Sequence, residues 1–274
     1  MVAMGAEERE QGMNLEEKIR AYWEDPNSRS LIDENLRRLE EGVVLRHLKP
    51  DQTLLDVGCG DGVSTLRYAS AVRSCLGVER SGRLLTAARE RLAGSPLRNT
   101  RFEGGDILRL QVNREAFDVV VSQRMLINLT SWELQQEGIA QMRAALRPGG
   151  LLILIENTDE GHDALNACRA AVNLKPIAKH WHNLYFRRAA FLDHMARGFE
   201  PVEERTFSLY YLLTRVYANC FASFKGFGAQ AVKDPVFGKI DASARALQEG
   251  LEGRVRIGPA PVIGPIQGFV FRRR

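Results

Sequence analysis

The chain has 274 residues, of which 45% are hydrophobic and 26% charged, a composition typical of a large globular domain. It has no run of 18 apolar residues, which excludes a membrane-spanning helix, and its basic residues alternate with acidic ones, so we expect neither a membrane nor a nucleic acid as partner. The four cysteines are widely spaced without a CxxC pair, so we expect reduced thiols, a cytoplasmic protein and no metal.

Two helices are predicted between Leu15 and Leu48, because apolar residues recur there at intervals of three and four. Pro26 separates them. The segment before them is acidic and polar and lacks the apolar core of a signal peptide, which agrees with a cytoplasmic location. Tyr22 and Trp23 lie on the first predicted helix, where they are either core residues or part of a lid over the ligand. We assign residues 1–48 to an N-terminal helical lid.

From residue 49 to 157, strand patterns alternate with helix patterns, which predicts an α/β fold with a parallel sheet covered on both faces. The predicted strands are 53–58, 74–79, 100–106, 116–123 and 150–157, and the predicted helices are 63–72, 82–93 and 132–146. Residues 158–274 lack this rhythm. We interpret them as a substrate cap with an insertion at 212–262, plus the last two strands, which begin near Phe199 and Ile266.

The stretch "LLDVGCGDG" places Gly58, Gly60 and Gly62 where the first of these strands meets a helix. Glycines there let a ligand lie against the backbone. The dinucleotide fingerprint requires a third glycine three residues after the second, where this chain has Val63. Asp56 would also repel a pyrophosphate, so the pattern favours a ligand with a positive group, with a plain structural turn as the alternative.

Further acids follow at the ends of the next two strands. Glu79 can accept both hydroxyls of a ribose, and Asp106 can accept the exocyclic amine of a base. Taken singly, each of these acids could instead be a solvated side chain at the end of a strand. Because the carboxyl ends of parallel strands form one ligand-binding edge, we expect Asp56, Glu79 and Asp106 to surround a single nucleoside-containing ligand.

These motifs, together with "FDVVVSQRMLINL" and "LRPGGLLILIE", resemble the successive motifs of class I S-adenosylmethionine-dependent methyltransferases over about residues 50–157. The resemblance implies a Rossmann-like seven-stranded sheet whose last strand is antiparallel. Beyond residue 157, "HWHNLYF" and "GPIQGFVF" are similar to bacterial small-molecule methyltransferases.

The resemblance also implies S-adenosyl-L-methionine as cofactor. Asp56, Gly58 and Gly60 would then border its methionine moiety, Glu79 its ribose, Asp106 and Ile107 its adenine, and Gln123 its sulfonium side. We include Cys59, Arg80 and Tyr22 in the cofactor site.

Transfer to a hydroxyl calls for a proton acceptor, and histidine is the usual one. Our prediction is His182 in "KHWHN", because Tyr185 and Phe186 follow it and could line an aromatic pocket. Two histidines at this spacing could instead chelate a metal or lie incidentally in a surface loop. We add Tyr211 from the aromatic-rich cap, and Arg124, which could face an anionic substrate or form a structural ion pair.

The sequence therefore predicts a methyltransferase acting on a small molecule, most readily an oxygen of a sugar-like or natural-product acceptor. N- or C-methylation, non-methylating chemistry assisted by the cofactor, and a non-catalytic cofactor-binding protein stay open. The segment after the fourth strand, "SQRML", lacks the proline-rich run of enzymes that methylate DNA bases. The 212–262 segment could form a wall of the substrate site or the surface of a homodimer.

Overall fold

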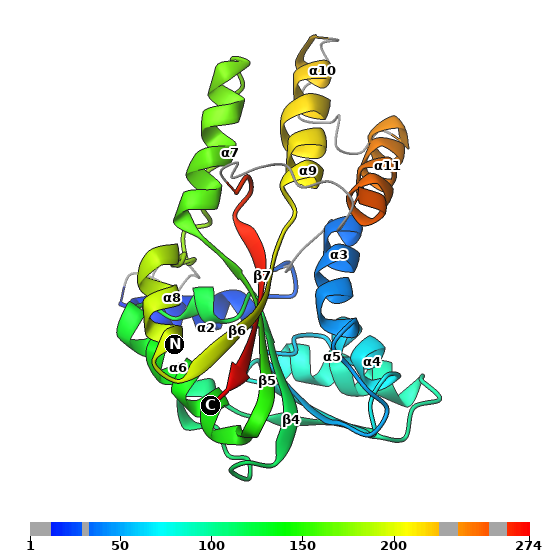
Figure 1. Cartoon of the computed structure of the whole chain (residues 1–274), viewed down its shortest axis with the longest axis vertical. Helices are drawn as coiled ribbons and strands as arrows, with labels where there is room; N and C mark the ends of the chain where they lie inside the picture. Colours follow the sequence, from blue (N-terminus) through cyan, green and yellow to red (C-terminus); the bar gives the residue numbers. More distant parts are fainter. Residues whose placement is uncertain (1–11, 29–32, 225–234, 252–261) are drawn as a thin grey trace, which may run out of the picture.

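A computed structural model describes residues 12–28, 33–224, 235–251 and 262–274 of the chain. One seven-stranded sheet runs through it in the order β3-β2-β1-β4-β5-β7-β6 (Figure 1). Strands β1 to β5 pair in parallel, whereas β7 is antiparallel to both β5 and β6. The predicted seven-stranded α/β sheet with an antiparallel last strand is confirmed.

The strand boundaries lie close to those predicted. The strands are β1 (Thr53–Val57), β2 (Ser74–Glu79), β3 (Thr100–Gly104), β4 (Phe117–Gln123), β5 (Leu146–Asn157), β6 (Phe199–Thr206) and β7 (Ile266–Arg273). The main difference is β5, which begins four residues early because Leu146 pairs with Phe117 before the regular register starts at Leu151. The central strands β1 and β4, and β5 from Gly150 onward, are almost fully buried, as expected for strands with helices on both faces.

Helices cover the two faces of the sheet. On one face lie α3 (Glu34–Leu45), α4 (Val63–Ala69) and α5 (Gly82–Ala93), and on the other lie α6 (Trp132–Ala145) and α8 (Arg188–Ala196). Val43 and Val44 of α3 are completely buried, so this second N-terminal helix is part of the core. Short 3-10 turns, η1 (Ile107–Arg109) and η2 (Leu126–Asn128), follow β3 and β4.

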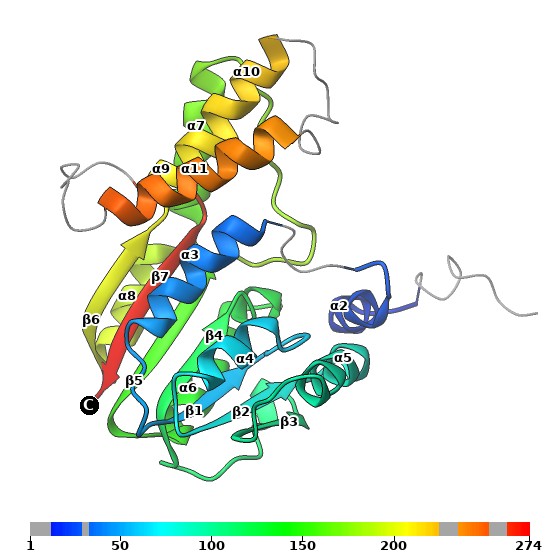
Figure 2. The same ribbon diagram turned by 90° about the vertical axis from the view of Figure 1, so that its right-hand side faces the viewer.

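Except for the first helix of the chain, the remaining helices extend beyond the carboxyl ends of the central strands (Figure 2). They are α7 (Asp159–Ala171), α9 (Ser208–Tyr211), the π-helical turn η3 (Leu212–Tyr217), α10 (Ala218–Phe224) and α11 (Pro235–Leu251). We call this group the cap. The predicted 212–262 insertion thus contains helices, and its residues 225–234 and 252–261 lie outside the described part.

The first helix, α2 (Leu15–Glu24), is separate from the cap and packs beside α5 (Figure 2). A capping box starts it: Asn14 accepts a hydrogen bond from the backbone of Glu17, and Glu17 accepts one from the backbone of Asn14. Within the described ranges, no helix has the length and apolar character needed to cross a bilayer.

Candidate functional site

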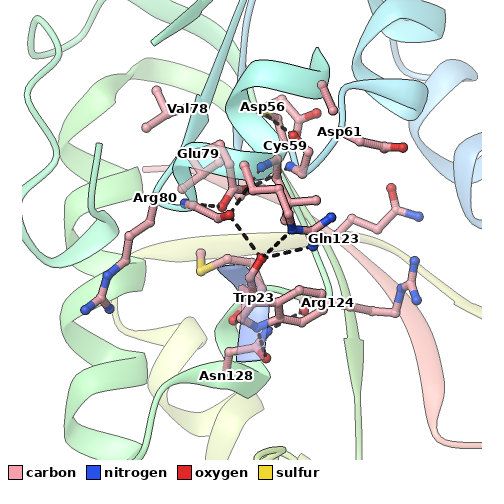
Figure 3. A pocket seen from close by; sticks show the side chains of 18 of the residues that line it. Trp23, Asp56, Cys59, Asp61, Val78, Glu79, Arg80, Gln123, Arg124 and Asn128 are labelled. Atoms are coloured by element: carbon pink, nitrogen blue, oxygen red, sulfur yellow. Dashed lines mark hydrogen bonds between the residues drawn. The ribbon is translucent and has the colours of Figure 1, made fainter. Parts of the chain in front are cut away.

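A cavity of about 600 Å³ lies at the carboxyl ends of the central strands (Figure 3). Its floor is the glycine turn after β1, and its walls come from the ends of β2 and β4, the loop after β3, and helices α2 and α3. All but one of the predicted cofactor residues line it: Asp56, Gly58, Cys59, Gly60, Glu79, Arg80, Asp106, Ile107 and Gln123. The structure therefore brings the predicted residues from the ends of four strands into one cavity.

The glycine turn is shaped for close approach of a ligand. Gly58 and Gly60 have φ angles of +73° and +57°, which disfavour any side chain. A Cβ on Gly58 would also lie 2.3 Å from Cγ of Met125, whereas a Cβ on Gly60 would meet no protein atom within 4 Å. Gly60 thus opens toward the cavity, and the backbone there can contact a bound molecule directly.

Glu79 is held rigidly at the end of β2. Its Oε2 accepts a hydrogen bond from the N–H of Gly60 at 2.9 Å, and its Oε1 accepts one from the N–H of Ser81 at 2.8 Å. Burial raises the pKa of Glu79 although these donors act in the opposite direction. Each carboxylate oxygen keeps a further lone pair, so the group can still accept two hydroxyls from a ribose.

Asp56 lies beneath the glycine turn and is almost fully buried. Its Oδ2 accepts a hydrogen bond from the hydroxyl of Thr65 at 2.6 Å. Burial, with the nearby charge of Glu79, raises the pKa of Asp56 to about 7. A cationic ligand in the cavity would therefore favour the ionised form of this carboxyl group.

Asp106 and Ile107, from the loop after β3, also line the cavity. Asp106 accepts a hydrogen bond from the N–H of Leu108 at 3.0 Å and lies 3.4 Å from Nε of Arg80. Ile107 is buried beside it. This combination of an acceptor and an apolar surface suits a purine base, so the acceptors of Asp106 and Glu79 fit a nucleoside at both its base and its sugar.

At the end of β4, Gln123 and Arg124 form the wall next to the glycine turn. The hydroxyl of Tyr68 donates to Oε1 of Gln123 at 3.0 Å, and Nε2 of Gln123 donates to Glu40. Arg124 has a φ of +53°, a strained conformation for a side chain of this size. Strained residues of this kind concentrate at functional sites.

Helix α2 lines one side of the cavity. Nε1 of Trp23 donates to Oδ1 of Asn128 in η2 at 3.3 Å, and the Trp23 carbonyl accepts from the hydroxyl of Ser81 at 3.1 Å. The carboxylate of Glu24 accepts hydrogen bonds from the N–H groups of Gly82 and Arg83, at 2.8 and 3.1 Å, at the start of α5. These contacts of α2 were not predicted, because their partners are 55 or more residues apart and leave no local pattern.

Three predicted residues lie outside the cavity lining. Tyr22 packs against His182 with ring centroids 4.5 Å apart, so α2 also contacts the "KHWHN" loop. Burial and the neighbouring His180 lower the pKa of His182 to about 4. Tyr211 of α9 is buried in the hydrophobic core, where burial raises its pKa strongly. At neutral pH His182 is thus uncharged, and its low pKa makes it a weak proton acceptor.

Residues 54–150 match a family model described as a methyltransferase domain. An uncharacterized methyltransferase of Anoxybacillus flavithermus is 27% identical over 150 residues, which cover 54% of this chain and 68% of that protein. The O-methyltransferase cnsE of Penicillium expansum is 29% identical over 139 residues, 49% of each chain. In three of the curated relatives, the region that matches this chain covers 45% to 68% of the relative's own length.

Among solved structures, the N-methyltransferase NodS from Bradyrhizobium japonicum, in complex with S-adenosyl-L-homocysteine, has the same fold. The two superpose with a TM-score of 0.56 at 14% identity, over 95% of this chain and 99% of NodS.

Proposed function

Because the chain carries a class I S-adenosylmethionine-dependent methyltransferase domain at residues 54–150, we propose that it transfers a methyl group to a hydroxyl oxygen of a small sugar-like or natural-product acceptor. The observation that carries the cofactor assignment is the cavity itself. It has an open glycine backbone at one side, a fixed carboxylate for the ribose and an acceptor for the base. S-adenosylmethionine, when bound, supplies an already activated methyl group.

Two observations support oxygen as the acceptor atom. One of the relatives, cnsE of Penicillium expansum, which is 29% identical to this chain over 139 residues, is an O-methyltransferase. In addition, "SQRML" after β4 has no proline-rich run of the kind that serves exocyclic amines of nucleic-acid bases. The enclosing lid suits such a reaction, since excluding water keeps the reacting atoms aligned.

The cofactor half of the proposal is tested by calorimetric titration with S-adenosylhomocysteine. We expect binding by the wild-type protein, no binding of NAD, and a loss of affinity of about 10- to 100-fold in Glu79→Ala, because two charge-assisted hydrogen bonds to the ribose disappear. Glu103→Gln is the matched control, since Glu103 is a solvent-exposed acid on the neighbouring strand. Equal affinity in both variants would contradict the role of Glu79.

The acceptor half is tested with methyl-labelled S-adenosylmethionine and a panel of sugars, phenols and amines. Product mass distinguishes methylation from non-methylating chemistry, and the position of the new methyl group distinguishes oxygen from nitrogen and carbon. A protein that binds the cofactor and methylates only amines would overturn the choice of oxygen while leaving the cofactor site intact.

A further inference from the structure

The side chain of Arg124, directly after β4, is a cation in the cavity wall (Figure 3). It is only 16% exposed, and its buried Nε donates no hydrogen bond to any described residue. The nearest carboxylate oxygen, Oε2 of Glu40, lies 3.4 Å from this Nε and already accepts a hydrogen bond from Gln123. A half-enclosed guanidinium with unpaired N–H groups beside a cavity is suited to an anionic ligand.

The backbone fixes the direction of this side chain. Arg124 has a φ of +53°, which a residue of this size rarely adopts. Its N–H donates to the carbonyl of Ile155 at 2.7 Å, and its own carbonyl accepts from Nδ2 of Asn128 at 3.0 Å. Strained conformations persist where surrounding bonds hold them in this way. The guanidinium is therefore positioned in the cavity by two strand ends and the turn η2.

Two buried carboxyl groups interact with this guanidinium, and they balance its charge only in part. They are Glu40 of α3 and Glu156 of β5. Burial raises the pKa of both acids, that of Glu156 to about 8, and the arginine offsets only part of this effect. Glu156 is thus protonated at neutral pH, so positive charge at Arg124 stays available to an anion from outside the protein.

Two other arginines of the cavity lining are committed to the structure of the protein itself. Nη2 of Arg37 donates to Glu34 at 3.0 Å, on the same helix. The guanidinium of Arg83 donates to the carbonyl of Trp23 at 2.9 and 3.1 Å. Arg124 has no bond of this kind, which marks it as the arginine with donors to offer to a ligand.

The strand order places Arg124 on the acceptor side of the cofactor. In the proposed binding mode the base lies at Asp106 after β3, and the ribose lies at Glu79 at the end of β2. The sulfonium is attached to the side of the ribose away from the base. Since β3, β2, β1 and β4 are successive neighbours in the sheet, the sulfonium points toward β1 and β4, and an acceptor meets it beside Arg124. The sulfonium and the guanidinium are both positive, so a negative group near them attracts both.

We propose that Arg124 binds a carboxylate of the acceptor, which makes the substrate a hydroxy acid such as a sugar acid or a hydroxybenzoate. This inference rests on the proposed methyl transfer to a hydroxyl oxygen. The planar guanidinium can hold both carboxylate oxygens at once, which orients the hydroxyl as well as attracting the acid. A single, partly balanced cation suits the one charge of a carboxylate better than the two charges of a phosphate.

The test uses pairs of acceptors in which a carboxylate replaces a CH₂OH group: glucuronate with glucose, and para-hydroxybenzoate with para-hydroxybenzyl alcohol. For the wild type we expect kcat/KM to be about 10²- to 10³-fold higher for the acid that reacts than for its neutral partner. Arg124→Gln should lower the value for the acid by a similar factor and change that for the neutral partner by less than about threefold. Arg124→Lys should restore part of the loss, because lysine keeps the charge but not the planar fork.

The matched control is Arg67→Gln. Arg67 pairs with Glu41, the residue next to Glu40 on α3, and does not line the cavity. This change also deprives a buried glutamate of α3 of its arginine, but it should leave the preference for acids at the wild-type level. S-adenosylhomocysteine, which carries a carboxylate of its own, should bind Arg124→Gln within about threefold of its wild-type affinity by calorimetry.

Each contrary result has a distinct meaning. If Arg124→Gln loses about tenfold or more in S-adenosylhomocysteine affinity and Arg67→Gln does not, Arg124 binds the cofactor carboxylate, and the proposal is wrong while the proposed function stands. Equal kcat/KM for acid and neutral partner in the wild type also overturns it, without any variant. A methyl ester as product would make the carboxylate the nucleophile instead of the anchor. If the wild type binds the cofactor but methylates no hydroxyl of these pairs or of the wider panel, both the oxygen acceptor and the role of Arg124 are overturned.

Discussion

At the scale of single residues, the carboxyl group of Glu156 shows how a buried acid shapes the site. It lies at the end of β5, and its Oε1 accepts hydrogen bonds from the N–H groups of Met125 and Leu126 at 3.1 and 2.9 Å. This fixes the segment that contributes Arg124 and Asn128 to the cavity wall. Burial raises the pKa of Glu156 to about 8, so the folded protein holds this group protonated at neutral pH.

The same residue predicts a pH dependence of stability. Between the pKa of an unfolded-chain glutamate, about 4.3, and about 8, the folded state binds one more proton than the unfolded state at this site. The free energy of unfolding therefore falls as pH rises through this window, by about 1.4 kcal/mol per pH unit at most. Glu156→Gln cannot titrate, so urea unfolding at about pH 5.5 and about pH 7.5 should show a smaller decline than in the wild type. Identical declines would contradict the raised pKa.

At the scale of an element, α2 is held to the rest of the molecule by its carboxyl end. Trp23 and Glu24 provide the contacts to α5 and η2, whereas the start of the helix is exposed. Tyr22 adds the aromatic contact to His182. We propose that the helix acts as a lid over the cofactor, the role that the sequence predicted for it.

Removing one of these contacts should loosen the lid. Glu24→Ala deprives the first turn of α5 of its capping carboxylate, a loss worth about 0.5–2 kcal/mol. We expect S-adenosylhomocysteine to dissociate about 3- to 30-fold faster, measured by stopped-flow fluorescence. Glu16→Ala, which removes an exposed acid from the same helix, is the control. The lid assignment fails if both variants release the ligand at the wild-type rate.

At the scale of the whole molecule, a small polar cluster connects the cap to helix α3 of the core. Asp33 starts α3 by accepting the N–H of Leu36, and it also accepts a hydrogen bond from the hydroxyl of Tyr210 at 2.8 Å and pairs with the guanidinium of Arg215. One side chain thus joins a core helix to two cap elements.

Asp33→Asn should separate the helix cap from the ion pair, because asparagine caps helices as well as aspartate does. The substitution removes the negative charge that pairs with the Arg215 guanidinium. Because Arg215 is partly exposed and water can solvate its unpaired charge, we expect the free energy of unfolding, measured in urea, to fall by only about 1–3 kcal/mol. The control is Arg197→Ala, which removes an exposed ion pair with Asp193. It should change the free energy of unfolding by less than about 0.5 kcal/mol. Similar effects of the two changes would show that the cluster does not hold the cap.

The sequence predicted the sheet and the cofactor side of the cavity because their signals are local. Three glycines and an acid within seven residues, and acids at strand ends, need no knowledge of distant contacts. The Trp23–Asn128 and Glu40–Gln123 contacts join positions 105 and 83 residues apart, and no short pattern marks them. Residue type alone pointed to His182 and Tyr211, but packing decides which side chains reach the cavity, and neither of them lines it.

The position of β7 has a consequence for biosynthesis. This strand lies between β5 and β6, yet the ribosome makes it after both, and after the helices of the cap. While the nascent chain grows, β6 has no strand partner and the outer edge of β5 is unpaired, and free edges of this kind invite pairing with other chains. Slow translation of the cap would lengthen that exposure, so the yield of this protein in cells should depend on elongation rate and chaperone supply more than its final stability suggests.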